Sequence, residues 1–547
     1  MKVLFVYPSI DCPAGINHGL AAISGVLKSR GHETKLIHVC DQLWPIPDYA
    51  EIKAIVEAFG PGIVGFSAMS QQYEWCIDLA AKLDRDFGIP TVVGGVHCTM
   101  VPEEVTADGR FDFVCVGEGE YAMLDLVERL EHGLDTTTVP NIRVPSSRID
   151  RVLSWIKPEA LAERKTLNPA AGQPIVNPVG PFPDLETLPP LDYDLFDLDY
   201  IIGKRDGWMG LLASRGCPYK CTYCFNKEIV DRYIEDGAAA KAKDYLRTYP
   251  VERVIGEIRD LKARFPHLKT LIFDDDLFTL DRDYVHRFCA AYDASGLAIP
   301  FVVNAHVQKF DEDMAEVLSR SGCLIVKYGL ESGSDEIRRK VLWRTMTNKR
   351  IEESFGAAHK FDLHTSAFVM FGLPFEDWGH IQETIRLCAR IKMGRFRWAI
   401  FFPFPGTAGY RIAKDADLID YERMKGLGNY FDGSCLKFGP DHDLLIEKLG
   451  KAFHWWVNAE SDWPTAPIYR ALVSELERMD RGAWDRAKSE ILKRDRELSE
   501  ELLQKGLPHY SVRYSHVMAV NSDFVNWERR QLELAQAKGN LRTYSLD

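Results

Sequence analysis

Short apolar runs alternate with amphipathic helical patterns in this chain, and that rhythm restricts the fold more than any other feature. In the N-terminal part of the chain the apolar runs are 2–7, 34–39, 62–67, 90–94 and 113–116. Helical patterns lie between them at 18–29, 49–59 and 74–87, and a further helix begins at Glu120. Apolar strands joined by helices pair in parallel and are covered on both faces. The sequence therefore predicts a doubly wound, Rossmann-like α/β domain over residues 1–145.

The same rhythm returns after a stretch that is rich in proline. Residues 146–205 are punctuated by prolines, which predicts an extended linker with little regular structure. A helix is expected at 251–265, and strands are expected at 210–214, 270–273, 302–305, 324–329, 367–372 and 398–402. Six such βα units form a partial (β/α)6 TIM barrel, whose ligand-binding edge is the rim at the carboxyl ends of its strands. We predict this core over 206–431.

The strand rhythm stops after about residue 432, and the rest of the chain is expected to be mostly helical. Helical patterns run through 441–461 and 468–505. We therefore predict a C-terminal helical domain over 432–547. Its cluster of aromatic residues at 453–456 is expected to belong to the core, as most such clusters do.

Three cysteines lie in one short loop after the first strand of the predicted barrel. Cys217, Cys221 and Cys224 have the spacing C-x3-C-x2-C. Three thiolates on one loop can hold three irons of a 4Fe–4S cube, which normally takes four cysteines, so that one iron stays open to a small molecule. The alternatives are redox cysteines or a zinc knuckle. Zinc would require a fourth ligand close by, and the nearest later candidates, His267 and Cys289, lie far along the chain.

Composition narrows the class of protein. A chain of 547 residues is expected to form two to four domains, and 46% hydrophobic with 27% charged residues is typical of a soluble globular protein. The net charge of −13 argues against nucleic acid as a partner. We find no apolar run of about 18 residues and no signal peptide, so no membrane partner is expected. Most of the 12 cysteines are scattered through apolar segments, which fits the reducing cytoplasm.

Glycines mark the ends of three strands in the N-terminal domain. The strand ends read Gly65-Phe66-Ser67, then Gly94-Gly95-Val96-His97-Cys98-Thr99, then Gly117-Glu118-Gly119-Glu120. Glycine lets a ligand approach the backbone closely, and open parallel sheets bind ligands at the carboxyl ends of their strands. A Rossmann-like domain with another nucleotide, or with no ligand, is the alternative interpretation.

Together with the cysteine triplet, this ordered set of glycine-rich loops resembles the cobalamin-dependent radical S-adenosylmethionine (SAM) enzymes, from the first strand to about residue 410. The resemblance implies a [4Fe–4S] cluster, SAM and cobalamin as cofactors, with the cluster on Cys217, Cys221 and Cys224. It implies cobalamin contacts for Ser67, Gly94, Gly95, His97, Thr99, Gly117 and Glu118. It implies SAM contacts for Tyr223, Asp275, Asp276, Glu331, Ser332, Arg344, Gly372 and Leu373. Arg338 is the alternative to Arg344, and no side chain is singled out as catalytic.

One departure from the family concerns the lower face of cobalt. Many cobalamin-binding domains carry D-x-H-x-x-G after the first strand, and its histidine ligates cobalt. The loop here reads Ser9-Ile10-Asp11-Cys12-Pro13-Ala14-Gly15-Ile16-Asn17-His18, without that motif. Cobalt is therefore expected to lack a histidine ligand, and His18 is the only imidazole nearby.

The resemblance also implies a reaction. A methyltransferase of this class passes a methyl group from SAM through methylcobalamin to an unactivated carbon, or to phosphorus, of a small-molecule biosynthetic intermediate by way of a 5′-deoxyadenosyl radical. An electron donor such as flavodoxin or ferredoxin is the expected partner. The main alternative is a cobalamin-dependent radical SAM cyclase, or an enzyme of oxidative rearrangement, without methyl transfer.

Two more distant alternatives fit the sequence less well. A tRNA methylthiotransferase is disfavoured by the acidic charge and by N-terminal cysteines that do not match its motif. A cobalamin sensor or carrier leaves the cysteine triplet and Glu331 unexplained. The sequence does not specify the substrate.

Overall fold

The computed structural model describes residues 1–162, 172–427, 431 and 433–524. Residues 163–171 of the predicted linker and the tail beyond 524 lie outside the described residues. By its internal contacts the chain divides into two compact units. Unit 1 comprises Met1–Asp276, Ser295–Ile299 and Phe404–Ala408; unit 2 comprises Leu277–Ala294, Pro300–Pro403 and Gly409–Asp547. In the part of the chain that the structure describes, no helix has the length and apolar character needed to cross a bilayer.

Unit 1 is built on a seven-stranded sheet of order β2-β1-β3-β4-β5-β6-β7. Five strands run parallel, as predicted: β1 (Lys2–Pro8), β2 (Glu33–Val39), β3 (Ile63–Ser67), β4 (Thr91–Gly94) and β5 (Phe113–Cys115). β6 (Ile142–Val144) and β7 (Ile175–Val176) extend it with antiparallel pairings that the sequence analysis missed. The strand order reverses between β1 and β3, the point at which open α/β sheets bind their ligands.

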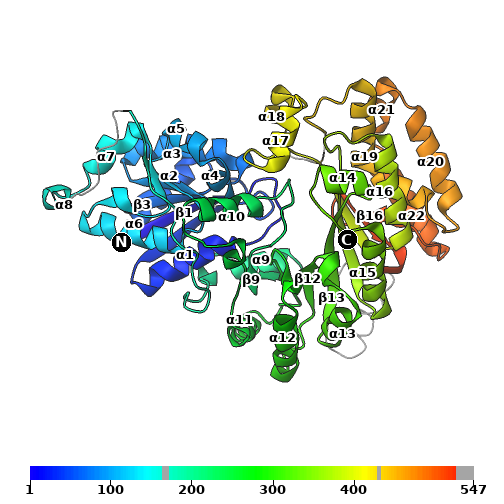
Figure 1. Ribbon diagram of the computed structural model, residues 1–547, viewed down its shortest axis with the longest axis horizontal. Helices are drawn as coiled ribbons and strands as arrows, with labels where there is room; N and C mark the ends of the chain where they lie inside the picture. Colours follow the sequence, from blue (N-terminus) through cyan, green and yellow to red (C-terminus); the bar gives the residue numbers. More distant parts are fainter. Residues whose placement is uncertain (163–171, 428–430, 432, 525–547) are drawn as a thin grey trace. The chain divides into compact units, whose positions relative to one another are not determined.

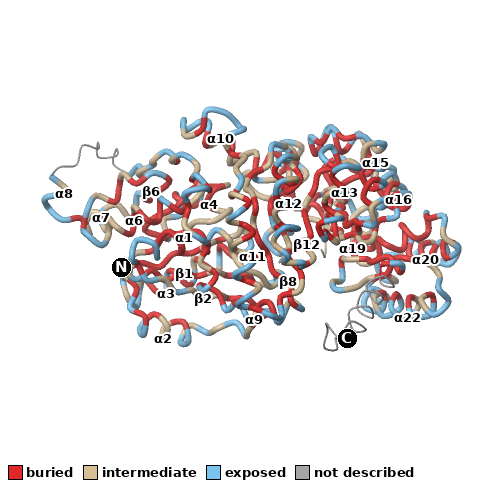
Figure 2. The backbone as a smooth tube through the Cα atoms, turned by 90° about the horizontal axis from the view of Figure 1, so that it is seen from below, coloured by how far each residue is buried: buried red, intermediate tan, exposed pale blue. Residues whose placement is uncertain are grey.

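Helices cover both faces of this sheet (Figure 1). α1 (His18–Ser29) and α6 (Glu120–His132) pack beside each other on one face, while α2 (Tyr49–Phe59) and α3 (Tyr73–Phe87) cover the other. Local sequence sets the ends of these helices: a capping box of Asp48 and Glu51 begins α2, and Gly60 in the left-handed conformation ends it. Figure 2 shows the strands as the buried layer between the helices.

The remainder of unit 1 begins with two short helices after β4 and continues through the predicted linker. The helices after β4 are α4 (Val96–Met100) and α5 (Pro102–Asp108). The linker holds more regular structure than expected, with the helices α7 (Ile149–Leu153), α8 (Pro158–Ala162) and α9 (Leu198–Lys204). The first two βα units of the predicted core follow: β8 (Trp208–Leu211), β9 (Ser214–Arg215), α10 (Asn226–Glu235), β10 (Arg247–Thr248), α11 (Val251–Arg264) and β11 (Thr270–Phe273). β8 pairs in parallel with β11, and β9 pairs antiparallel with β10.

Unit 2 continues the βα rhythm of the core. Its parallel strands pair in chain order: β12 (Phe301–Ala305), β13 (Cys323–Glu331), β14 (His364–Phe371) and β15 (Arg395–Ile400). The helices between and beside them are α12 (Arg282–Ser295), α13 (Glu312–Arg320), α14 (Asp335–Lys340), α15 (Asn348–Lys360), α16 (Trp378–Ile391), α17 (Ala408–Asp415) and α18 (Tyr421–Gly426). The predicted strand positions are therefore confirmed to within a few residues.

The C-terminal part contains helices, as predicted, but also two strands. The second predicted helix is broken into three; the helices are α19 (Pro440–Ala459), α20 (Ala466–Arg478), α21 (Arg481–Ala487) and α22 (Ile491–Gln504). Two short strands that were not predicted also follow residue 432: β16 (Tyr510–Val512) pairs with β17 (Met518–Asn521), which pairs antiparallel with β15. The aromatic cluster of α19 belongs to the core: Phe453 stacks on Phe371, and Trp398 Nε1 donates to the carbonyl of Gly450 at 3.0 Å.

The segment 404–408, which follows the last parallel strand of the core, belongs to unit 1. Gly406 has a φ of +86°, and a Cβ at this position would stand 2.4 Å from the carbonyl oxygen of Met100. Only glycine allows this approach of the two backbones.

Glycine also permits a close contact between α1 and the end of the linker. A Cβ at Gly25 would stand 2.3 Å from the carbonyl oxygen of Pro190, and Asp192 N donates to the carbonyl of Ala21 at 2.9 Å. We therefore expect Gly25→Ala to lower the melting temperature of the protein, because overpacking costs about 1–3 kcal/mol. Gly256→Ala in α11, where nothing lies within 4 Å, is the matched control and should stabilise by up to about 1 kcal/mol. Equal melting temperatures for Gly25→Ala and the wild type would contradict the close packing.

Candidate functional site

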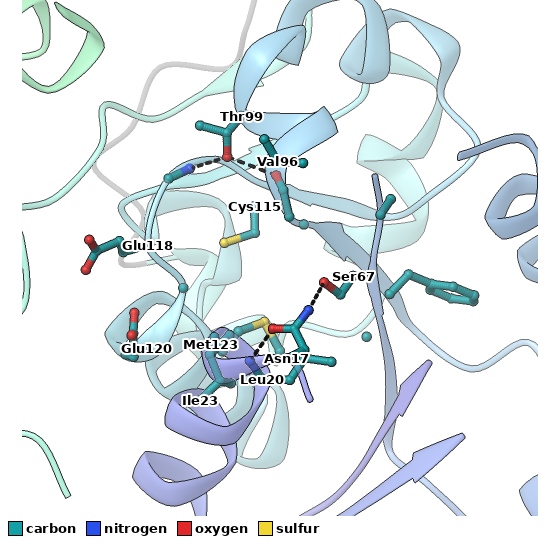
Figure 3. A pocket seen from close by; sticks show the side chains of 18 of the residues that line it. Asn17, Leu20, Ile23, Ser67, Val96, Thr99, Cys115, Glu118, Glu120 and Met123 are labelled. Atoms are coloured by element: carbon teal, nitrogen blue, oxygen red, sulfur yellow. Dashed lines mark hydrogen bonds between the residues drawn. The ribbon is translucent and has the colours of Figure 1, made fainter. Parts of the chain in front are cut away.

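A cavity of about 360 Å³ opens at the carboxyl ends of the parallel strands of unit 1 (Figure 3). Its inner wall is apolar, because Leu20 and Ile23 of α1, Met123 of α6 and Cys115 of β5 face it. Glycines form much of the remaining wall: Gly65, Gly94, Gly95, Gly117 and Gly119. An apolar cavity with exposed backbone suits an organic ligand whose body is largely apolar.

Hydrogen bonds fix the loops around this cavity. Asn17 Oδ1 caps α1 by accepting from Leu20 N at 3.0 Å, while its Nδ2 donates to Ser67 Oγ at 3.1 Å. Thr99 Oγ1 donates to the carbonyl of Gly95 at 3.0 Å and accepts from Gly117 N at 3.0 Å. The loops after β4 and β5 are thereby tied together across the cavity.

Gly95 and Gly94 have different structural roles although both line the cavity. Gly95 has a φ of +96°, and a Cβ there would lie 2.8 Å from the carbonyl oxygen of Ala68. Gly94 has no positive φ, and the nearest atom to its Cβ would be Cys115 Cβ at 3.4 Å. The backbone requires glycine at position 95, whereas at position 94 a side chain would mainly occupy the cavity.

Most of the residues that the sequence analysis assigned to cobalamin line this one cavity: Ser67, Gly94, Gly95, Thr99, Gly117 and Glu118. His97 and His18 are not among the lining residues. His97 Nδ1 lies 3.0 Å from Ser70 Oγ, and burial lowers the pKa of His97 to about 4, so that its ring is neutral at pH 7. His18 Nε2 lies 3.4 Å from Asp274 Oδ2.

The three cysteines lie on the loop between β9 and α10, and one carboxylate holds both ends of that loop. Asp276 Oδ2 accepts from Gly216 N at 3.1 Å, and Asp276 Oδ1 accepts from Asn226 Nδ2 at 2.9 Å. Gly216 has a φ of +101°, and a Cβ there would stand 2.4 Å from the carbonyl oxygen of Tyr245. The turn that leads into the cysteines therefore requires glycine.

The three cysteines of this loop are buried or partly buried. Cys221 is buried, while Cys217, Cys224 and the intervening Tyr223 are partly buried. Burial raises the pKa of Cys224 to about 12, so that metal binding has to displace its proton. Within the described ranges, no group of three or more His, Cys, Asp or Glu residues is arranged to hold one metal ion. In a cube each thiolate binds its own iron, which is the arrangement that a single loop with this spacing can supply.

Asp275 contacts the backbone in front of the cysteine loop. Its Oδ2 accepts from Ala213 N at 3.0 Å, and its Oδ1 accepts from Ser214 Oγ. Asp275 is fully buried, which raises its pKa to about 7. Both acidic residues that we expected near SAM thus have contacts that shape the cysteine loop, and their contact with SAM stays a prediction.

In unit 2, Glu331 and Arg344 lie next to each other at the carboxyl end of β13. Glu331 has a φ of +66° and follows a register shift in the pairing of β13 with β14. A Cβ at Gly329 would lie 2.5 Å from Glu331 Oε1 and 3.4 Å from an Arg344 guanidinium nitrogen. Arg344 also donates to the carbonyl of Gly329 at 2.5 Å. A left-handed non-glycine residue is strained, and such strain concentrates at functional sites.

The loop after Glu331 is held by the other candidate arginine. Arg338 is fully buried and donates to the carbonyl of Ser332 at 2.7 Å and to that of Met346 at 3.2 Å. Ser332 Oγ lies 3.2 Å from Thr384 Oγ1. Arg338 therefore holds the loop, and of the two arginines the geometry favours Arg344 for a ligand beside Glu331.

The loop after β14 contains a buried acid that the sequence analysis did not single out. Gly372 has a φ of +71°, and the amide of the buried Leu373 donates to Glu376 Oε2 at 3.2 Å. Burial raises the pKa of Glu376 to about 8. The carboxyl group of Glu376 thus fixes the backbone of the two residues that we assigned to SAM. The sequence signal that could have identified Glu376 is its position as an acidic residue shortly after Leu373-Pro374.

A second missed group connects the cavity with the cysteine loop inside unit 1. Arg215, which precedes Gly216, pairs with Glu118 at 3.0 Å and with Glu120 at 2.6 Å, and all three residues line the cavity. Phe225 and Ile229, which follow Cys224, line it as well. Glu120 is buried and Glu118 is partly buried, and carboxylates in such surroundings require partners. The local sequence carries no signal that names Arg215 as that partner.

Two family models match the chain. The B12 binding domain matches residues 14–127, and the Radical SAM superfamily matches residues 211–388. The first match contains the strand ends that line the cavity. The second contains the cysteine loop, Glu331 and Gly372.

Relatives are similar over most of the chain. An uncharacterized methyltransferase of Pyrococcus horikoshii is 26% identical over 426 residues, which is 76% of this chain and 83% of that protein. The cytidylyl-2-hydroxyethylphosphonate methyltransferase of Streptomyces wedmorensis is 24% identical over 390 residues, covering 65% and 68%. The anaerobic magnesium-protoporphyrin IX monomethyl ester cyclase of Rubrivivax gelatinosus is 22% identical over 476 residues, covering 83% and 77%.

Solved structures share the fold. The radical S-adenosylmethionine methyltransferase TsrM from Kitasatospora setae, with cobalamin and a [4Fe-4S] cluster bound, has a TM-score of 0.56 at 17% identity, covering 76% of this chain and 78% of that chain. The cobalamin-dependent S-adenosylmethionine radical enzyme OxsB, with aqua-cobalamin and S-adenosylmethionine bound, has a TM-score of 0.61 at 15% identity, covering 100% and 82%. These similarities confirm the predicted fold class.

The raised pKa of Glu376 predicts a pH dependence of stability. The folded protein keeps the Glu376 proton up to about pH 8, whereas an unfolded chain releases it near the ordinary glutamate pKa of 4.5. Between these two pKa values the unfolded state therefore binds fewer protons than the folded state. The free energy of unfolding falls as pH rises through this range. Glu376→Gln removes this loss. Between about pH 6 and about pH 9 the stability of the variant relative to the wild type should increase by on the order of 2 kcal/mol. Melting temperatures of both proteins at the two pH values measure this change.

The matched control for this experiment is Glu316→Gln, because Glu316 is exposed on α13. Its melting temperature should follow that of the wild type at both pH values. If the difference in melting temperature between Glu376→Gln and the wild type is the same at both pH values, the buried carboxyl group does not retain its proton.

Proposed function

We propose that this chain, which contains a B12 binding domain followed by a radical SAM domain, is a cobalamin-dependent radical SAM methyltransferase that acts on a small-molecule biosynthetic intermediate. One observation carries the proposal. The glycine-walled cavity and the cysteine loop are built together in unit 1, because Phe225 and Ile229 behind Cys224 line the same cavity as Gly94 and Gly117. Under this proposal one compact body would hold both a corrinoid and an iron–sulfur cluster.

The proposal assigns each group to named residues. Cys217, Cys221 and Cys224 would hold the [4Fe–4S] cluster. The contacts to SAM would come from Tyr223, Asp275, Asp276, Glu331, Ser332, Arg344, Gly372 and Leu373, and those to cobalamin from Ser67, Gly94, Gly95, Thr99, Gly117 and Glu118. When bound, these groups supply the reductive cleavage of SAM and the transferable methyl group, while the protein supplies position and surroundings.

The side chains of this protein would bind and orient these groups. Glu331 would accept hydrogen bonds from an ammonium or a ribose hydroxyl, and Arg344 would pair with a carboxylate through its planar fork of donors. Asp276 keeps the cysteine loop closed at both ends. The apolar wall around Leu20, Ile23 and Met123 keeps water away from the buried part of the ligand.

The names of the relatives support methyl transfer and also define the second candidate. The proteins of Pyrococcus and Streptomyces are methyltransferases, and so is TsrM. The protein of Rubrivivax is a cyclase, so a cyclase that uses the same cofactors is the alternative. Anaerobic incubation with candidate intermediates and methyl-deuterated SAM separates the two. A product that carries one labelled methyl group supports the proposal, and a new product without the label supports the cyclase.

Three further assignments belong to the same proposal. The electron donor would be a flavodoxin or ferredoxin, and the enzyme would work in the reducing cytoplasm, where thiols and an oxygen-sensitive cluster persist. The domain limits would be 1–145, 146–205, 206–431 and 432–547.

The cluster assignment predicts the effect of removing one ligand. Cys221→Ala should reduce the formation of 5′-deoxyadenosine from SAM to background under anaerobic reduction, because one iron loses its protein ligand. Hydroxocobalamin binding, followed by absorbance, should persist. Cys289→Ala is the matched control, since Cys289 is buried in α12, and it should cleave SAM at the rate of the wild type. Undiminished 5′-deoxyadenosine from Cys221→Ala would refute the cluster assignment.

The cavity assignment predicts the effect of filling it. Gly94→Trp places a ring in the cavity without backbone strain, so hydroxocobalamin affinity should fall at least ~10-fold, equivalent to about 1.4 kcal/mol. SAM cleavage should continue, because the cysteine loop is unchanged. Gly203→Trp in α9, where nothing lies within 4 Å of the added Cβ, is the control and should bind like the wild type. Full cobalamin loading of Gly94→Trp would rule out this cavity.

A further inference from the structure

The four residues Gly117–Glu120 form one wall of the cavity in unit 1, and side chains from both sides of the cysteine loop hold them. We call these residues the cavity loop; all four line the cavity. Arg215 lies two positions before Cys217, and Tyr233 lies on α10, which begins directly after the cysteine loop. The cavity loop therefore contacts the chain immediately before the cysteines and shortly after them.

Ion pairs make the first of these contacts. Arg215 donates to Glu118 Oε2 at 3.0 Å, to Glu120 Oε1 at 2.6 Å and to Tyr249 Oη at 3.1 Å. Arg247 donates to Glu118 Oε2 at 3.1 Å and makes a second contact to Glu118 Oε1. The Glu120 side chain is only 3% exposed, and that of Arg215 only 13%. Two cations and two carboxylates compensate each other in this buried group, and removing one partner of such a group is costly.

A backbone contact adds to the ion pairs. Tyr233 Oη accepts from Glu118 N at 2.9 Å, and a Cβ at Gly117, whose φ is +83°, would lie 2.5 Å from the same oxygen. Phe182 stacks on Tyr233 with ring centroids 3.8 Å apart. The cavity loop thus has little room to move without moving α10.

The path from Arg215 to the cysteines is short and stiff. Arg215 pairs with Arg247 across the β9–β10 ladder, and the next residue, Gly216, is fixed between Tyr245 and Asp276. A ligand that displaces the cavity loop therefore displaces the residue from which the cysteine loop starts. Conversely, a cluster that orders the cysteine loop also orders Arg215 and its two carboxylate partners.

We propose that Arg215 is a positioning residue that couples the two cofactor sites, so that a corrinoid in the cavity and a cluster on the three cysteines each strengthen the binding of the other. This inference rests on the proposed function of both sites. Because coupling between two binding sites is reciprocal, each cofactor must change the affinity for the other by the same factor.

The first test compares hydroxocobalamin affinity with and without the cluster. Absorbance titrations under anaerobic conditions give the Kd for the reconstituted wild type and for the cluster-free Cys221→Ala protein. Coupling predicts that the reconstituted protein binds at least ~5-fold more tightly, the lower end of usual coupling factors. The reciprocal readout is the rate at which a chelator removes iron from the reconstituted protein, which hydroxocobalamin should slow by a similar factor.

Arg215→Lys and Glu120→Gln are the test variants, because each keeps the approximate volume of the side chain and weakens the ion pairs. In each variant the ratio of hydroxocobalamin affinity with the cluster to that without it should fall toward one. The factor by which hydroxocobalamin slows the removal of iron should fall toward one as well. A merely structural role would weaken each binding event but leave the ratio unchanged, so the ratio is the deciding quantity. If Arg215→Lys does not take up iron, Glu120→Gln, which leaves the arginine in place, gives the result.

The matched control is Arg148→Lys. Arg148 pairs with Asp84 at 3.0 Å in unit 1, with side chains 20% and 27% exposed, and neither residue lines the cavity. This variant should retain the ratio of the wild type. A ratio of one in the wild type, or equal ratios in the wild type and both test variants, would overturn the coupling and leave the proposed function intact. A wild type that takes up neither hydroxocobalamin nor iron would instead overturn the proposed function.

Discussion

The parallel pairing of β1, β3, β4 and β5 is the constraint on which the site in unit 1 depends. Parallel strands place their carboxyl ends at one edge of the sheet, so the loops after them meet although they are far apart in the chain. The loops after β4 and β5 are rich in glycine, and together with Gly65 of β3 and the helices α1 and α6 they enclose the cavity. A register slip in this sheet would separate Ser67, Gly94 and Gly117, and no local change could restore the cavity.

Acidic residues in this protein mainly fix loops. Asp276 holds both ends of the cysteine loop, Asp275 holds the strand that leads into it, and Glu376 holds the loop after β14. Each acid accepts hydrogen bonds from backbone amides that no strand pairing satisfies, and a buried polar group without a partner is costly. Glu331 differs from them, because its strained backbone places its carboxylate beside Arg344 at a strand end. This difference sets Glu331 apart as the acid most suited to a ligand.

Long periodic segments were predictable from sequence and short ones were not. α1 and α2 have the predicted bounds, because a hydrophobic repeat over a whole element specifies its type. β6, β7, β16 and β17 are two to four residues long, too short to show a repeat, and they form because neighbouring strands offer unpaired edges. The candidate residues of the cavity were also predictable, since glycines at strand ends are local signals. The partners of Glu118 depend on contacts between distant segments and could not be predicted.

Neither unit is a continuous stretch of chain, because unit 1 includes residues 404–408. During synthesis on the ribosome, the part of unit 1 that ends at Asp276 emerges first, and the parallel strands of unit 2, β12 to β15, follow before Gly406 becomes available to meet Met100. The first unit therefore cannot complete its packing until the parallel strands of the second have been made. Truncation between the two units would leave unit 1 without this segment, so the full chain is the smallest piece in which both units have all their residues.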